Sequence, residues 1–158
     1  MLILRPTTSD DLAAVVTIEA APDTAAWLST TGLAWHQDAL ADADLDHVVV
    51  EHDGVLTGFA VLAGLTTGDG VVEVRRMVLA PMVRGAGLGR ALVQAAVGRA
   101  YDRHGASRVW LDVKAHNDRA RFLYASEGFT ETERVAAAVT ETDGTTSDLV
   151  VMVHRPND

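Results

Sequence analysis

The chain has 158 residues, of which 48% are apolar, and it carries a formal net charge of −9. This length predicts one domain, residues 1–158, with its own core, and the excess of acids argues against a nucleic-acid partner. The absence of Cys excludes disulfides, thiolate metal sites and cysteine nucleophiles. The sequence offers no apolar run of the roughly 18 residues that predict a membrane span, and its start predicts a short strand rather than a signal peptide, so we expect a cytoplasmic protein without a membrane partner.

Basic residues are concentrated in the middle of the chain. Residues 74–125 hold ten of the 13 Lys and Arg residues and three acids, whereas residues 1–73 hold 12 acids and one base, Arg5. Such a distribution is consistent with an anionic ligand held near the middle of the chain, or with chance clustering of charges on a solvated surface.

The N-terminal half combines predicted strands with short helices. In chain order, the pattern predicts a strand over 2–5, a helix capped by Thr8 and ended by Pro22, one or two short helices within 24–44, and strands over 47–51, 55–65 and 71–79. Asp53-Gly54 is a hairpin turn signal between two of these strands. Strict alternation within 71–79 places Glu73, Arg75 and Met77 on one face, and Val72, Val74 and Val78 on the other.

The C-terminal half predicts a helix over 88–103, a strand over 107–113, a helix over 118–127 that Asn117 caps, and two strands over 130–138 and 147–154. The resulting order of elements is β-α-α-β-β-β-α-β-α-β-β. This order predicts a mixed α/β or α+β domain.

A glycine-rich turn, Arg84-Gly85-Ala86-Gly87-Leu88-Gly89-Arg90, joins the strand over 71–79 to the helix that follows. Glycines let the backbone approach a ligand closely, and the first N–H groups of a helix form an anion site. The P-loop pattern requires Gly-Lys-Ser/Thr, and the dinucleotide pattern requires Gly at position 90, so neither pattern is present. On spacing alone, a tight turn without a ligand remains the alternative.

Two motifs together carry a family resemblance. Arg84-x-x-Gly87-x-Gly89 resembles the pyrophosphate-binding motif of the GNAT superfamily of N-acyltransferases. The stretch from Asn117 to Phe129 is similar to the family's Asn-x-x-Ala-x-x-x-Tyr-x-x-x-Gly-Phe segment. The resemblance covers about residues 2–135, and the two motifs follow in the family's order.

This resemblance implies a single-domain GNAT fold, with a central mixed and mostly antiparallel sheet of about seven strands flanked by about four helices. It also implies acetyl-CoA as co-substrate. The cofactor-binding residues that it implies are Met77, Val78, Leu79, Arg84, Gly85, Ala86, Gly87, Leu88, Gly89, Arg90, Asn117 and Tyr124.

The family's chemistry is direct attack of an amine on the acetyl thioester. By resemblance, Glu73 is the candidate general base, and Asp112 or a water held by backbone carbonyls are the alternatives. Tyr124 is the candidate acid for the leaving thiolate, because Asn117, Ala120 and Tyr124 share one helix face. A backbone N–H of Val78 or Leu79 would stabilise the charge on the thioester oxygen.

The acceptor amine is the least determined part of this hypothesis. Family members build the acceptor site from the first helices and nearby loops, where acidic and aromatic side chains suit a cationic amine. These residues are Trp27, Trp35, His36, Asp38, Asp42, Asp44 and Asp46. The alternative interpretation is a solvated acidic helix, and protein N-termini, polyamines, aminoglycosides and small metabolites all remain candidates.

Three further expectations complete the sequence hypothesis. The six histidines show no metal-ligand spacing, so we predict no metal site. Many family members dimerise, which leaves a homodimer open. A non-catalytic sensor that binds CoA or acyl-CoA is the alternative function, and the presence of Glu73 and Tyr124 argues against it.

Overall fold

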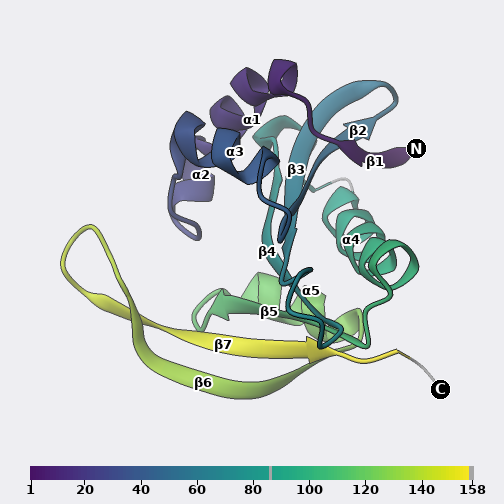
Figure 1. Ribbon diagram of the computed structural model, residues 1–158. Coiled ribbons are helices and arrows are strands. Elements are labelled where there is room, and N and C mark those ends of the chain that lie inside the picture. Colours follow the sequence, from purple (N-terminus) through teal and green to yellow (C-terminus); the bar gives the residue numbers. More distant parts are fainter. Residues whose placement is uncertain (86, 157–158) are drawn as a thin grey trace.

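A seven-stranded sheet forms the centre of the fold. The computed structural model describes residues 1–85 and 87–156. The strands lie in the order β1-β2-β3-β4-β5-β7-β6, and all neighbours are antiparallel except β4 and β5 (Figure 1). This confirms the predicted mixed sheet. The strands are β1 (Leu2–Pro6), β2 (Asp46–His52), β3 (Val55–Ala63), β4 (Val71–Leu79), β5 (Arg108–Lys114), β6 (Phe129–Thr140) and β7 (Thr146–His154).

Helices cover both faces of the sheet (Figure 1). The described residues form α1 (Leu12–Glu19), α2 (Pro22–Ala25), α3 (Gly32–Leu40), α4 (Leu88–His104) and α5 (Asp118–Ser126), together with 3-10 turns at Ser9–Asp11 and Pro81–Val83. The five α-helices exceed the expected number by one, because the segment between α1 and β2 forms two short helices. None of these helices is long and apolar enough to cross a membrane.

The core is divided by the sheet. On one face, Val15 of α1 and Trp35 of α3 pack with Phe59 and Val78. On the other face, α4 and α5 pack against a larger cluster that includes Val74 of β4 and Leu111 of β5. The cofactor-binding turn predicted from the sequence therefore begins the helix, α4, that covers this second face.

A β-bulge in β4 changes which side chains share a face. The pairing of β3 with β4 shifts from Val61 opposite Arg76 to Leu62 opposite Val74, so Arg75 is the extra residue. Beyond the bulge, alternation resumes one residue out of phase. Met77 consequently packs on the α4 face with Val74, and Val78 packs on the α1 face. The strict alternation predicted over 71–79 is therefore wrong beyond Val74.

Local turn chemistry agrees with the sequence at two points. Asp53 and Gly54 take φ values of 51° and 82° in the turn between β2 and β3, as Asp-Gly hairpin turns require. The Asn117 side chain accepts a hydrogen bond from the backbone N–H of Ala120 at 3.2 Å, so it caps α5 as predicted.

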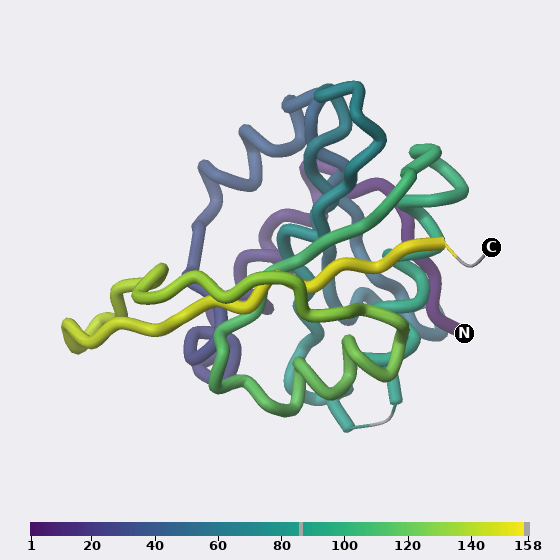
Figure 2. Tube along the Cα trace, turned by 90° about the horizontal axis from the view of Figure 1, so that it is seen from below, coloured from purple at the N-terminus to yellow at the C-terminus, as the bar shows by residue number. Residues whose placement is uncertain are grey.

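The β6–β7 hairpin projects beyond the rest of the molecule in both views (Figures 1 and 2). It is held at its far end by Lys114 of β5, whose Nζ lies 2.7 Å from Oε1 of Glu141. The same Nζ donates to the carbonyl oxygen of Ala26 at 3.3 Å. Lys114 therefore joins the hairpin to the segment that follows α2.

Candidate active site

The two parallel strands separate after a short paired stretch. β4 pairs with β5 at three positions, the last of which joins Glu73 and Trp110. Beyond it, among the described residues, β4 continues to pair only with β3, and β5 only with β7. The edges of β4 and β5 that face one another are thus not paired with each other, and their backbone N–H and C=O groups are directed into the opening between them.

The direction of the β4 backbone groups follows from the pairing with β3. The Ala80 N–H donates to Thr57 O at 2.7 Å, so Ala80 and Thr57 form a hydrogen-bonded pair. In an antiparallel ladder the next residue points its N–H and C=O the other way. The groups of Leu79 therefore point toward the opening, and those of Val78 point toward β3.

The glycine turn lies at the end of β4 and begins α4. Gly85 and Gly87 have φ values of 85° and 77°, and an added Cβ at either would meet no atom within 4 Å. The backbone conformation, rather than packing, is what requires glycine at these two positions. The first N–H groups of α4 have no partner within the helix, so the turn presents donors to solvent. Ala86 lies outside the described residues.

Both arginines of the turn are hydrogen-bonded to the protein. Arg84 donates from Nε and Nη2 to the carbonyl oxygen of Leu79, at 3.1 and 3.0 Å, and from Nη2 to Thr24 Oγ1 at 2.7 Å. Arg90 pairs with Glu127 and donates to Ser126 Oγ at 2.9 Å. Arg84 thus connects β4 with α2, and Arg90 connects the first turn of α4 with the end of α5.

Tyr124 lies on α5, half-buried against the core cluster and 5.8 Å from the Phe129 ring between centroids. Burial raises the pKa of its hydroxyl to about 12. Its hydroxyl makes no hydrogen bond with any residue of the described part of the chain. The structure therefore places a protonated, unpartnered phenol on the helix that Arg90 joins to the glycine turn.

Glu73 marks the point where β4 and β5 separate. Its Oε1 accepts hydrogen bonds from Nε and Nη2 of Arg75, at 3.1 and 2.9 Å. The side chain is 16% exposed. The Glu73 carboxylate is therefore partly accessible to solvent, but it already forms an ion pair with the guanidinium group of Arg75, the extra residue of the bulge.

The acidic residues expected around the acceptor do not converge. Asp44 accepts from the N–H groups of Gly64 and Thr66, at 3.1 and 2.9 Å, and so holds a turn. Asp46 pairs with Arg99 and His104 on α4. These carboxylates stabilise the fold, and they are not available for an amine.

A buried polar network lies on the α1 face of the sheet. It includes His36, which the sequence analysis placed in the acceptor site but which is fully buried, and Glu19, which the sequence analysis did not single out. Glu19 is fully buried and accepts from Thr31, from His36 Nε2 at 3.1 Å and from Arg76 Nη1 at 3.1 Å. Burial alone would raise the pKa of Glu19, but the hydrogen bonds from His36 and Thr31 and the charge of Arg76 lower it to about 2. The sequence contains a sign that Glu19 is buried, because Glu19 lies on the same helical face as the apolar residues Leu12 and Val15.

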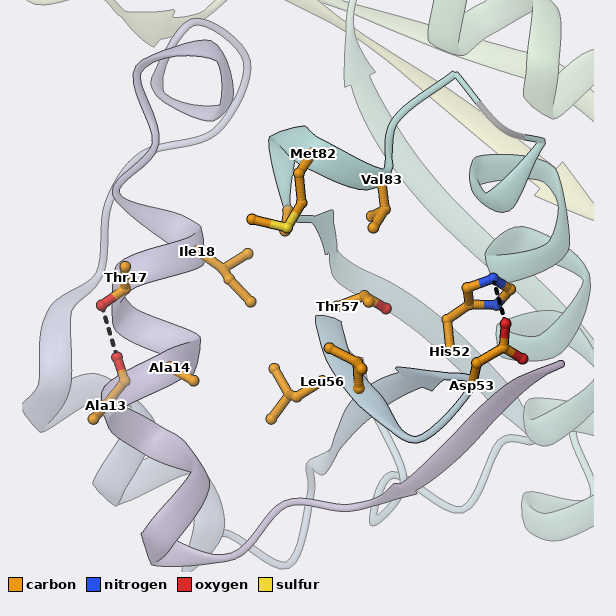
Figure 3. Close-up of a pocket in the computed structure, with 12 residues that line it drawn as sticks. Ala13, Ala14, Thr17, Ile18, His52, Asp53, Leu56, Thr57, Met82 and Val83 are labelled. Atoms are coloured by element: carbon orange, nitrogen blue, oxygen red, sulfur yellow. Dashed lines mark hydrogen bonds and ion pairs between the residues drawn. The ribbon is translucent and has the colours of Figure 1, made fainter.

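An apolar surface groove of about 690 Å³ lies elsewhere, between α1, the β2–β3 hairpin and the residues after β4. Figure 3 shows side chains such as Ile18, Leu56 and Met82 directed into it. Neither Glu73 nor Tyr124 lines this groove, so it is distinct from the opening between β4 and β5.

A mixed sheet that opens between two parallel strands, followed by a glycine turn at a helix N-terminus, is an architecture that can hold an extended, anionic cofactor across the sheet. The model of the acetyltransferase (GNAT) family matches residues 12–129. The chain belongs to this family, as the two motifs predicted.

Curated relatives and solved structures agree with this assignment. An uncharacterized N-acetyltransferase of Mycobacterium bovis is 38% identical over 82 residues, which are 52% of this chain and 51% of the relative, and another from Mycobacterium tuberculosis matches equally. The chain thus spans about half the length of the curated relatives it matches.

Two solved structures show the same fold over nearly the whole chain. Spermidine N-acetyltransferase from Vibrio cholerae, in complex with CoA and spermine, has a TM-score of 0.87 at 20% identity and covers 98% of this chain and 95% of its own. A putative phosphinothricin N-acetyltransferase has a TM-score of 0.85 at 21% identity and covers both chains fully.

Proposed function

We propose that this protein is an acetyl-CoA-dependent N-acetyltransferase that moves the acetyl group directly onto a primary amine, either a small molecule or a protein N-terminus. The observation that carries the proposal is the unpaired edge of β4, which leads from Glu73 into the glycine turn at the start of α4. An extended cofactor in this opening has its diphosphate at the turn and its thioester near the middle of β4.

Cofactor binding is assigned to the backbone of the opening and the turn. The N–H groups at the start of α4, with Gly85 and Gly87, would hold the diphosphate. Arg84 and Arg90 supply positive charge beside it while keeping their contacts to the protein. Capping uses only the side-chain oxygen of Asn117, and its nitrogen makes no hydrogen bond with residues 1–85 or 87–156, so this nitrogen can donate to the cofactor.

The transfer step requires a neutral amine. A primary ammonium has a pKa near 10.4, so at pH 7 the neutral form costs roughly 4–5 kcal/mol. Glu73 would remove this proton directly or through a water. As nitrogen attacks the carbonyl carbon and the C–S bond breaks, Tyr124 donates its proton to the leaving thiolate. The nitrogen loses its second proton to water as the amide forms, and water reprotonates the Tyr124 phenolate.

A backbone donor would stabilise the oxygen of the thioester as it gains charge. The direction of the β4 groups favours Leu79 over Val78 for this role, because the Leu79 N–H points toward the opening. One such donor contributes about 2.7–4 kcal/mol in other enzymes.

The experiment is a panel of amines incubated with acetyl-CoA and the protein, with release of free thiol as the readout. Amine-dependent thiol release is the expected result. Tight binding of CoA without turnover of any amine would instead support a sensor that binds CoA or acyl-CoA. Binding of ATP or NAD tighter than that of CoA would overturn the proposal.

A further inference from the structure

The two helices beside the glycine turn, α4 and α5, lie next to each other and run in the same direction. At the start of α4, an added Cβ at Gly89 would lie 3.8 Å from Cδ2 of Leu123 on α5. Further along both helices, Gln94 Nε2 donates to Oε1 of Glu127 at 2.8 Å. Later residues of α5 therefore meet later residues of α4. Going back along α5 from Leu123 leads past the first turn of α4 toward the glycine turn.

Arg119 lies on α5 one helical turn before Leu123. Residues four apart share a helix face, and helix side chains lean toward the N-terminus, so Arg119 extends beyond Gly89 toward the glycine turn. Its side chain is exposed, and within residues 1–85 and 87–156 its guanidinium makes no hydrogen bond and no ion pair. The adjacent acid, Asp118, points about 100° away around the helix. The charge of Arg119 is therefore available to an anion.

The arginines of the glycine turn already have acidic neighbours. Arg90 pairs with Glu127, and Nη1 of Arg84 lies 3.5 Å from Oδ2 of Asp23. CoA carries a diphosphate and, separately, a phosphate on the 3′ oxygen of its ribose. The N-terminus of α4 suits the diphosphate. The 3′-phosphate needs a further cation, and an arginine fork matches the geometry of a phosphate group.

Phe122 is 74% exposed, although its side chain is apolar. It follows Arg119 by three residues and precedes Ser126 by four, so the three side chains form one stripe along α5. Oγ of Ser126 accepts a hydrogen bond from Nη1 of Arg90 at 2.9 Å, so this stripe borders the first turn of α4. An exposed aromatic ring beside an arginine is a surface on which a purine base can stack.

We infer that Arg119 and Phe122 form the subsite for the 3′-phosphoadenosine end of CoA. The guanidinium of Arg119 pairs with the 3′-phosphate, and the ring of Phe122 stacks on the adenine. This inference rests on the proposed function, whose diphosphate and thioester positions it extends to the remaining end of the cofactor. It makes the chain selective for CoA over the same molecule without its 3′-phosphate.

The test is calorimetric titration of the protein with CoA and with 3′-dephospho-CoA. The variants are Arg119→Gln and Phe122→Ala. Arg103→Gln, which removes an exposed arginine in the last turn of α4, is the control for charge. Leu33→Ala, which removes a 48% exposed apolar side chain from α3, is the control for apolar surface. Because all four side chains are exposed, the variants should fold normally, and circular dichroism checks this.

We expect Arg119→Gln to raise the Kd of CoA about fivefold, the effect of losing a strong exposed ion pair, and to leave the Kd of 3′-dephospho-CoA unchanged. Phe122→Ala should raise the Kd of both ligands about five- to tenfold, because both contain the adenine. The two controls should bind both ligands as the wild type does.

Three results would overturn the inference. An equal loss for both ligands in Arg119→Gln would place this arginine at the diphosphate. Unchanged CoA affinity in Arg119→Gln, or in Phe122→Ala, would remove that residue from the subsite. Each of these results leaves the proposed function standing, whereas a wild-type protein that binds neither ligand would overturn both. Tight CoA binding with this selectivity, but without thiol release from acetyl-CoA with any amine, would overturn only the proposed transfer.

Discussion

The imidazole rings of His36 and His47 are hydrogen-bonded to each other inside the protein, with 2.9 Å between His36 Nδ1 and His47 Nε2. On one side of this pair, His36 Nε2 is hydrogen-bonded to Glu19 Oε1 at 3.1 Å. On the other side, His47 Nδ1 is hydrogen-bonded to Thr7 Oγ1 at 2.8 Å. A neutral pair satisfies every position: the Thr7 hydroxyl donates to His47, His47 donates to His36, and His36 donates to Glu19. This tautomer assignment follows from the hydrogen-bond pattern.

This pair should make stability depend on pH. Burial is the main cause that lowers the pKa of His47 from 6.5 to about 4. Between pH 6.5 and about 4, the unfolded protein binds a proton at His47 that the folded protein does not bind. The free energy of unfolding should therefore fall as the pH drops through this range, by up to roughly 3 kcal/mol. Urea unfolding at a series of pH values measures this slope.

The control separates His47 from the other histidines. His47→Gln should flatten the slope between pH 6.5 and about 4, at the cost of lower stability at neutral pH. His52→Gln, which removes a side chain that is 35% exposed, should keep the slope. Equal slopes for the His47→Gln variant and the wild type would show that this ring does not titrate as described.

Gly87→Ala should weaken CoA binding. The residue has a φ of 77°, where an alanine is strained by about 1–2 kcal/mol, and its new methyl group would face the bound diphosphate. Gly144→Ala in the β6–β7 turn is the matched control, because its φ is 86° and its surroundings are equally open. Both variants should lose similar stability in thermal unfolding, but calorimetric titration should show weaker CoA binding only for Gly87→Ala.

Tyr124→Phe should lower kcat by about 10²–10⁴-fold while CoA affinity stays nearly intact, because the lost proton donor acts in the chemical step. Tyr101→Phe is the control: its hydroxyl lies 2.7 Å from His154 Nδ1, where it supports the fold rather than the opening. An unchanged kcat in the Tyr124→Phe variant would mean that the thiolate obtains its proton from another source.

Glu73→Gln should lower kcat/KM at neutral pH, and the defect should shrink as pH approaches about 10, where the amine loses its own proton. Glu131→Gln, which also removes a carboxylate that accepts from an arginine, Arg121, serves as the control. The pH profiles of the three proteins provide the measurement. A defect that is constant with pH would assign Glu73 to positioning instead of proton transfer.

The sequence was most informative where one residue type is required by backbone geometry. Gly87, Asp53-Gly54 and the cap Asn117 could all be predicted from their positions, and the structure confirms the conformation at each. Patterns that depend on strict periodicity were less informative. A single inserted residue at Arg75 reversed the facing of Met77 and Val78, and alternation alone contains no sign of it.

Charge pairing was the part of the site that the sequence could not supply. Acidic residues in α3 and the turn after it suggested an acceptor site. In the structure, however, Asp44 accepts a hydrogen bond from the backbone N–H of Gly64, and Asp46 forms an ion pair with Arg99 of α4, both distant in the sequence. Whether a carboxylate is paired depends on which strands meet, and that is decided by the tertiary fold.

The pairing of β4 with β5 ends after three positions, so the sheet has an internal seam, the region between the two strands where they are not hydrogen-bonded to each other. Beyond the pair formed by Glu73 and Trp110, the described parts of the two strands are no longer paired with each other, so there they are joined through the helices and the strands on either side. CoA carries amide groups along its pantetheine arm, and a molecule that bridges both strands would close the seam. At about 100 times its Kd it should add roughly 2.7 kcal/mol to the stability of the whole chain, and slow amide exchange first in β4 and β5. The cofactor would then act as a structural element of the sheet as well as a reactant.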